Sequence, residues 1–144
     1  MKCSEVMTSN PRFCLPTDTA FEAAQLMKSE DVGPIPIVTD AESKKLVGIV
    51  TDRDLVLKVV AEGLDPKSTR LQDVMSTDLF TGRSDEDADK AIELMQEHQV
   101  RRIPVVDDSG WLVGIISQAD VATRIDEPDK TADTVEEISK AAYR

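Results

Sequence analysis

Aromatic residues, cysteine and histidine are scarce in this sequence. Its 144 residues include five aromatic residues, two cysteines and one histidine. Aliphatic side chains and methionine must therefore form the core. With one histidine and no Cys-x-x-Cys pair, neither a disulfide framework nor a zinc site is predicted. We expect Cys3 and Cys14 to be reduced, small hydrophobic residues. A disulfide between them or between subunits is the alternative.

Long apolar runs and an excess of basic residues are also missing. Residues 1–5 lack the apolar core of a signal peptide, and no later run has the length of a membrane span. The 28 acidic residues outnumber the 17 basic ones and give a net charge of −11. Nucleic-acid-binding proteins usually carry a basic face or stripe. These absences predict a cytoplasmic protein that binds neither nucleic acid nor membranes.

An internal duplication organises the chain. Three blocks of the first half recur in the same order about 68 residues later: residues 5–8 as 73–76, residues 23–40 as 91–108, and residues 46–55 as 112–121. The longest block is identical at eight of eighteen positions. Agreement in order and spacing across three blocks indicates a true repeat rather than chance.

Both copies predict the same order of elements, β-α-β-β-α. Each has an amphipathic segment with apolar residues at i, i+3, i+4 and i+7, followed by two β-rich runs joined by a turn. A second helix begins after Thr51 or Ser117, and a weaker strand precedes the first helix. The expected ranges are helices at 20–30 and 88–98, strands at 35–39, 46–50, 103–107 and 111–116, and weak strands at 13–15 and 79–81.

The fold class that follows is α/β (α+β), with two repeats related by a pseudo-two-fold axis. Half of this chain is near the lower size limit of an independent fold, so the repeats should bury one another's apolar faces. An apolar surface left over would favour a homodimer. We assign repeat 1 to residues 6–66, repeat 2 to 74–126, and an acidic helical tail to 127–144, which contains a capping-box pattern.

One repeated motif has two interpretations. GIVTDRD at residues 48–54 recurs as GIISQAD at residues 114–120, each at the predicted start of a helix. Ser/Thr-x-x-Asp can simply be a capping box, in which the hydroxyl satisfies a backbone N–H. The same geometry also suits a ligand. A helix start favours a phosphate, and a carboxylate can accept two hydrogen bonds from a vicinal diol such as ribose.

A second repeated element is Ile35-Pro36-Ile37, echoed by Ile103-Pro104-Val105. Proline at a strand start lacks an N–H, so the flanking backbone groups are expected to be free to pair with a planar group such as a purine edge. An ordinary edge strand is the alternative. Arg101 and Arg102 replace Gly33 and Pro34 of the first copy, and Arg53 has an alanine as its counterpart.

Those three arginines are either solvated surface residues or the local cations that an acidic protein needs to hold a phosphate. Because they are distributed unequally between the copies, we expect two unequal sites. The sequence does not rank the two sites.

Taken in order, Val-Met-Thr/Ser, Ile-Pro with β-branched residues, and Gly-h-h-Thr/Ser-x-x-Asp resemble the tandem CBS-domain pair, also called a Bateman module. The resemblance covers Val6 to Ile125. The overall layout is similar to that of stand-alone bacterial CBS-pair proteins of the hypoxic-response type. It implies a non-catalytic regulatory module, homodimeric, that binds AMP, ADP or ATP in the cleft between repeats and signals to a separate, unidentified protein.

Site residues follow from the same resemblance. It implies that Asp54 and Asp120 hold ribose hydroxyls and that Thr51 and Ser117 contact phosphate. The backbone of residues 35–37 and 103–105 would face adenine, and the arginines named above would lie near the phosphate. No cofactor is required and no catalytic or metal-binding residue is predicted.

Alternatives remain open. The first is a ligand-free dimerisation or interaction module, whose Thr/Ser-x-x-Asp elements only cap helices. S-adenosyl compounds, NAD(H) and cyclic dinucleotides also offer a ribose diol. An enzyme has little support, because the sequence shows no evident nucleophile–base pair and no phosphate-binding glycine loop. For His98, at a predicted helix end, we expect a structural or surface role.

Overall fold

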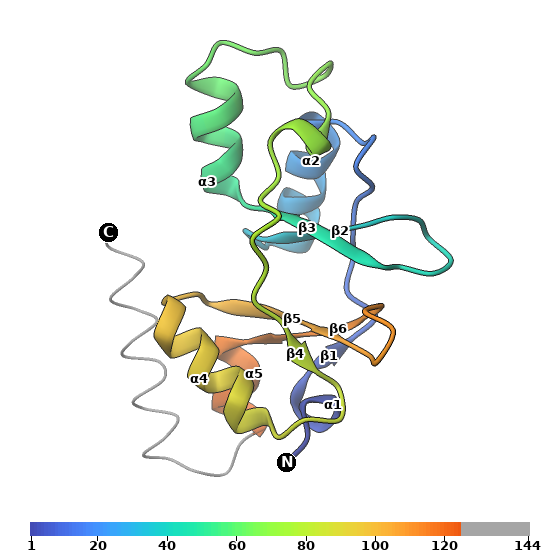
Figure 1. The fold of residues 1–144 in the computed structure, drawn as a ribbon. Coiled ribbons are helices and arrows are strands. Elements are labelled where there is room, and N and C mark those ends of the chain that lie inside the picture. The colour runs from blue at the N-terminus through green and yellow to red at the C-terminus, as the bar shows by residue number, and fades with distance from the viewer. Residues whose placement is uncertain (125–144) are drawn as a thin grey trace. The chain divides into compact units, whose positions relative to one another are not determined.

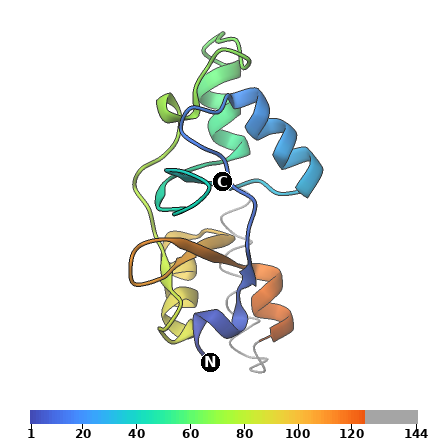
Figure 2. The same cartoon turned by 90° about the vertical axis from the view of Figure 1, so that its right-hand side faces the viewer.

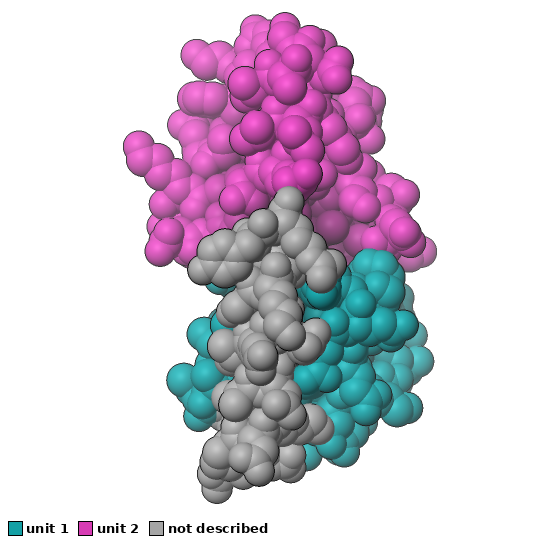
Figure 3. Space-filling view, turned by 90° about the vertical axis from the view of Figure 1, so that its left-hand side faces the viewer, with its two compact units in different colours: residues 1–11, 80–144 teal, residues 12–79 magenta. Residues whose placement is uncertain are grey.

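The computed structural model describes residues 1–124, so the predicted tail at 127–144 lies outside the described residues. The chain forms two compact units (Figure 3). Unit 2 is the continuous segment Arg12–Leu79, and unit 1 combines Met1–Pro11 with the chain from Phe80 onward. Unit 1 is therefore built from both ends of the described chain.

In unit 2, two helical segments cover one face of a β-hairpin (Figure 1). Its elements are α2 (Ala20–Glu30), β2 (Ile35–Val38), β3 (Leu46–Val50), α3 (Asp52–Leu55), the π-helical segment η1 (Val56–Val60) that continues α3, and the 3-10 turn η2 (Leu71–Asp73). Strands β2 and β3 are antiparallel, with Ile35 opposite Val50. Helix α2 begins where the Thr19 hydroxyl accepts the Glu22 N–H at 3.2 Å. It ends at Asp31, which is left-handed at φ 53°.

In unit 1, helices α1, α4 and α5 lie on one face of a four-stranded sheet (Figures 1 and 2). Its elements are α1 (Cys3–Val6), β1 (Thr8–Ser9), β4 (Gly82–Arg83), α4 (Ala88–His98), β5 (Arg102–Val106), β6 (Leu112–Ser117) and α5 (Gln118–Arg124). The strand order is β1-β6-β5-β4; β4 runs parallel to β5, and the other pairs are antiparallel. The sheet therefore joins the N-terminus to the second repeat.

The predicted helices at 20–30 and 88–98 are confirmed, and so are both hairpins, to within one residue at every strand end. The weak strands were predicted less well. Residues 13–15 form no strand, and only Cys14 bridges to Ile37. The strand expected at 79–81 begins instead at Gly82. These short segments carry too few alternating residues for the sequence pattern to locate them.

The compact units do not coincide with the sequence repeats, because the first residues of each repeat belong to the unit that holds the rest of the other repeat. The segment at residues 6–8 opens repeat 1, yet its Thr8 pairs with Ile115 of β6 in unit 1. Its counterpart at residues 74–76 opens repeat 2, yet Ser76 pairs with Ile49 of β3 in unit 2. Each Val-Met-Thr/Ser segment therefore packs on the hairpin of the other repeat. This exchange of opening segments between repeats was not predicted from the sequence.

Both cysteines lie in the hydrophobic cores, Cys3 in unit 1 and Cys14 in unit 2. Cys3 is 0% exposed and Cys14 is 5% exposed, and both are free thiols. Burial, assisted by nearby carboxylates, raises the pKa of each thiol to about 11. Both cysteines thus pack as small hydrophobic residues, as predicted, and they are not bonded to each other.

Candidate functional site

The first candidate site, here called the first junction, is Thr51 and Asp54, where β3 meets α3. The Thr51 N–H donates to Asp54 Oδ2 at 2.9 Å, and the Asp54 N–H donates to Thr51 Oγ1 at 3.1 Å. These reciprocal bonds form a capping box, which fixes the orientation of the carboxylate. The capping interpretation of the motif is therefore correct as a description of structure, although it does not decide whether a ligand also binds.

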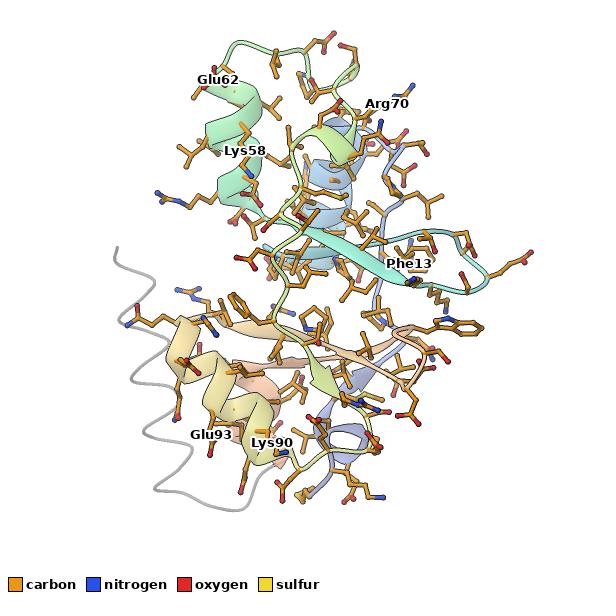
Figure 4. All side chains as sticks on the ribbon, viewed as in Figure 1. Phe13, Lys58, Glu62, Arg70, Lys90 and Glu93 are labelled. Carbon is orange, nitrogen blue, oxygen red and sulfur yellow. The ribbon has the colours of Figure 1, made fainter. Side chains whose placement is uncertain are left out.

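The other carboxylate oxygen of the first junction faces a lysine that was not predicted from the sequence. This residue is Lys58 of η1 (Figure 4). Its Nζ lies 3.3 Å from Asp54 Oδ1 and also donates to the Val74 carbonyl at 3.0 Å. The Asp54 side chain is 20% exposed and that of Lys58 is 46% exposed. An ionised carboxylate can accept about four hydrogen bonds, so Asp54 keeps acceptor capacity at the surface.

The second junction, Ser117 and Asp120 where β6 meets α5, is more enclosed. The Ser117 N–H and hydroxyl donate to Asp120 Oδ2 at 2.9 Å and 3.0 Å, and the Asp120 N–H donates to Ser117 Oγ at 3.1 Å. The Thr8 hydroxyl donates to Asp120 Oδ1 at 3.1 Å. Asp120 is only 7% exposed. Both of its oxygens therefore accept hydrogen bonds from protein donors.

Each Ile-Pro strand pairs with the strand that leads into a junction. Ile35 lies opposite Val50, and Ile103 lies opposite Ile116, the residues just before Thr51 and Ser117. All six predicted side chains are buried: Ile35, Pro36, Ile37, Ile103, Pro104 and Val105. They could offer a ligand only backbone groups. The expectation of free backbone is wrong for the Pro36 carbonyl, which accepts the Cys14 N–H at 3.1 Å because Cys14, in the predicted weak strand at 13–15, bridges to β2 here.

The three predicted arginines are placed unevenly. Arg53 lies exposed on α3 within the first junction. Arg102 pairs with Ser117 across β5 and β6, and the Arg101 carbonyl accepts the Gln118 N–H at 3.0 Å, so both flank the second junction. Within residues 1–124, none of the three forms an ion pair. Their charges are thus available, and their contact with a phosphate stays a prediction.

Two residues that contact the junction carboxylates, Lys58 and Thr8, were not predicted from the sequence. Lys58 follows Asp54 by four residues on one helix, a spacing that indicates an ion pair and could have been recognised. Thr8 is 112 residues from Asp120 in the chain, so no local pattern predicts their bond.

The described part of the chain shows neither a metal cluster nor a membrane helix. Among residues 1–124, no three His, Cys, Asp or Glu side chains gather where they could hold a metal ion. No helix in that range combines the length and apolarity needed to cross a membrane. His98 stacks on Phe80, with ring centroids 3.6 Å apart and planes inclined by 16°. This packing gives the histidine a structural role.

The sequence matches the family model of the CBS domain twice, over residues 3–61 and 71–127. The CBS domain-containing protein YhcV of Bacillus subtilis is 42% identical over 118 residues, which are 82% of this chain and 81% of that protein. An uncharacterized protein of Methanopyrus kandleri is 38% identical over 125 residues, 87% of this chain but 62% of that protein. The chain belongs to the CBS-domain family.

Solved structures agree with this assignment. Hypoxic Response Protein I with two coordinated zinc ions has a TM-score of 0.78 at 32% identity and covers 87% of this chain and 99% of its own. CBSX2 in complex with AMP has a TM-score of 0.71 at 25% identity, with 84% and 93% covered. The CBS domain pair of MJ0100, in complex with 5-methylthioadenosine and S-adenosyl-L-methionine, has a TM-score of 0.71 at 26% identity. The match covers 85% of this chain and 93% of that one. The predicted resemblance and fold class are confirmed.

The class of protein is therefore a CBS pair, a regulatory module rather than a known catalytic domain. Enzymes do contain such modules. Inosine-5'-monophosphate dehydrogenase of Methanocaldococcus jannaschii is 33% identical over 132 residues, but the chain spans only 25% of that enzyme. The likeness therefore gives no ground for assigning that enzyme's activity to this chain.

Proposed function

We propose that this chain is a non-catalytic regulatory module that binds an adenine nucleotide and passes the signal to a separate protein. The observation that carries the proposal is the first junction, where a hydroxyl and a partly exposed carboxylate are fixed one turn apart. Support also comes from two structural relatives, since CBSX2 was crystallised with AMP and the CBS domain pair of MJ0100 with 5-methylthioadenosine and S-adenosyl-L-methionine.

The chemistry of the first junction suits a nucleotide. Asp54 can accept hydrogen bonds from both hydroxyls of a ribose, because its carboxylate is already oriented and has lone pairs that no residue of the described range uses. Thr51 Oγ1 accepts the Asp54 N–H, and its hydroxyl donates no hydrogen bond within residues 1–124, so its proton is available to a phosphate oxygen. Arg53 and Lys58 supply local positive charge against the net charge of −11.

Titration calorimetry with AMP, ADP, ATP and S-adenosylmethionine tests this proposal. Replacing Asp54 with alanine removes hydrogen bonds to a charged group, each worth about 1.5–3 kcal/mol, so nucleotide affinity should fall at least about tenfold. Asp54→Asn keeps an oxygen to accept the Thr51 N–H but loses the charge, and it should also bind weakly. The matched control is Asp52→Ala, which removes the same charge from the exposed neighbour and should leave the affinity within about threefold.

Two results would contradict the nucleotide proposal. One is the absence of heat and of thermal stabilisation with all four ligands. The other is an equal loss of affinity in the Asp52→Ala and Asp54→Ala chains, which would indicate general electrostatics rather than a contact with the diol.

A ligand-free interaction module is the second candidate function. It is favoured by the intact capping boxes at both junctions and by an apolar surface on η1, where Val56, Leu57 and Val60 are 56%, 47% and 69% exposed. A homodimer would cover such a surface. Sedimentation of the wild type and of a Val56→Ser/Val60→Ser chain tests it. Dimerisation that these substitutions abolish, together with silent calorimetry, would favour this candidate.

A further inference from the structure

The two junctions carry the same motif, but their carboxylates differ in exposure and in hydrogen-bond partners. We propose that they are ligand sites of unequal affinity, and that the junction of Asp54 binds a nucleotide more tightly than the junction of Asp120. At Asp120, the Thr8 hydroxyl takes the position that a ligand hydroxyl would occupy and so competes with the ligand. This inference rests on the proposed function and goes beyond it, because the sequence alone does not rank the sites and the family match does not single out Thr8.

Acceptor capacity is the first difference. Asp120 Oδ2 accepts two hydrogen bonds from Ser117, and Asp120 Oδ1 accepts one from Thr8. A diol binding there would have to displace a part-buried hydrogen bond to a charged group. Among residues 1–124, Asp54 accepts only the Thr51 N–H and the half-exposed Lys58 ammonium. An exposed ion pair is weak, so a diol displaces it easily or binds beside it.

The hydroxyl donors differ in the same direction. The Ser117 hydroxyl donates to its own Asp120, whereas the Thr51 hydroxyl, as a donor, is unused within the described residues. A phosphate oxygen at the first junction therefore meets a ready donor. At the second junction the ligand must first break an internal bond. Exposure, carboxylate partners and hydroxyl donors thus give the same ranking of the two sites.

Thr8 has a counterpart that shows what an open junction looks like. Ser76 holds the equivalent place in unit 2, where its backbone exchanges hydrogen bonds with Ile49 at 2.8 Å and 2.9 Å. In the part of the chain that the structure describes, the Ser76 hydroxyl makes no hydrogen bond to Asp54. Threonine is stiffer than serine at χ1, which helps to hold the Thr8 hydroxyl toward Asp120.

Calorimetry with AMP and with ATP tests the ranking. The wild type should show one tighter and one weaker site per chain. Asp54→Ala should remove the tighter one, and Asp120→Ala should change it less than about twofold. Thr8→Ala should strengthen the weaker site about three- to tenfold, because the competing internal bond is lost. The matched control Ser76→Ala should alter neither site.

Thr8→Val provides a second test should the alanine variant fail to fold, since it keeps the side-chain shape and removes only the donor. Two equal sites in the wild type, a larger loss from Asp120→Ala than from Asp54→Ala, or an unchanged weaker site in a folded Thr8 variant would overturn the inference and leave nucleotide binding standing. No heat from any chain with either nucleotide would overturn the proposed function itself, and this ranking with it.

Discussion

Replacing Gly114 with alanine should destabilise unit 1, because this glycine lies beneath the opening segment of the chain. A Cβ atom at position 114 would lie 2.7 Å from Met7 Cγ and 3.0 Å from the Thr8 carbonyl oxygen, and it would also strike the Met7 sulfur. Non-bonded carbon atoms are normally about 3.5–4.0 Å apart. The methionine can rotate away, but the Thr8 carbonyl belongs to β1, which is paired with β6 at Ile115.

The expected cost follows from these distances. Overpacking a filled site costs about 1–3 kcal/mol, and alanine returns about 0.4–1 kcal/mol by restricting the unfolded chain. We expect a net loss of about 2 kcal/mol for Gly114→Ala, since a strand and a side chain must both move. Gly48→Ala should lose about 1 kcal/mol, because its Cβ would lie 2.5 Å from the Met75 sulfur, which can rotate away, and 3.2 Å from the Ser76 carbonyl oxygen.

Urea unfolding followed by circular dichroism measures these losses, and about 2 kcal/mol should lower the midpoint by about 1 M. Gly82→Ala is the control, since its Cβ would meet Ala91 and Cys3 at an ordinary 3.4 Å. Shortening Met7 to alanine should relieve part of the Gly114→Ala loss in a double-mutant cycle. Equal midpoints for the Gly114 and Gly82 variants, or no coupling between positions 7 and 114, would refute the packing argument.

Three further predictions concern stability. As pH rises, unfolded thiols ionise near pKa 9.0 but Cys3 and Cys14 only near about 11, so their contribution to the free energy of unfolding is retained below pH 9 and lost between pH 9 and 11. Urea unfolding of a Cys3→Ala/Cys14→Ala chain should show a smaller fall over that range. Thr19→Ala removes the cap that accepts the Glu22 N–H and should cost about 1 kcal/mol in urea, and a cost below about 0.3 kcal/mol would contradict the cap. Lys58→Met should cost less than about 1 kcal/mol by thermal unfolding, since a half-exposed ion pair contributes little, and a larger loss would show that the Val74 carbonyl depends on it.

Local patterns in the sequence predicted the parts of the fold that depend on local periodicity. Helix α2 is bounded by a Thr19 cap and a left-handed Asp31, and α4 carries apolar residues at helical spacing, so both could be placed from the sequence. The hairpins followed from short β-branched runs separated by turn residues. Apolar residue type was less informative in the π-helical segment η1, where Val59 is buried but Val56 and Val60 are exposed.

Long-range partners could not be predicted in the same way. Gly48 and Gly114 were recognised as repeated residues, but glycine is needed there because an opening segment pairs antiparallel with each strand, and that segment comes from the other repeat. The bond from Thr8 to Asp120 has the same origin. Each half of the sequence fits the same pattern locally, and nothing in that pattern states which opening segment packs on which hairpin.

Helix capping and ligand binding are compatible at the first junction, although the sequence presented them as alternatives. The cap uses one lone pair of Asp54 and holds the carboxylate in a fixed orientation, so a diol that binds the remaining lone pairs need not order that side chain again. Loss of Asp54 should therefore lower both stability and affinity. The two effects separate in the Asp54→Asn chain, which keeps an acceptor for the Thr51 N–H. Stability there should stay near that of the wild type while nucleotide affinity falls, and an unchanged affinity would mean that the carboxylate serves only the helix.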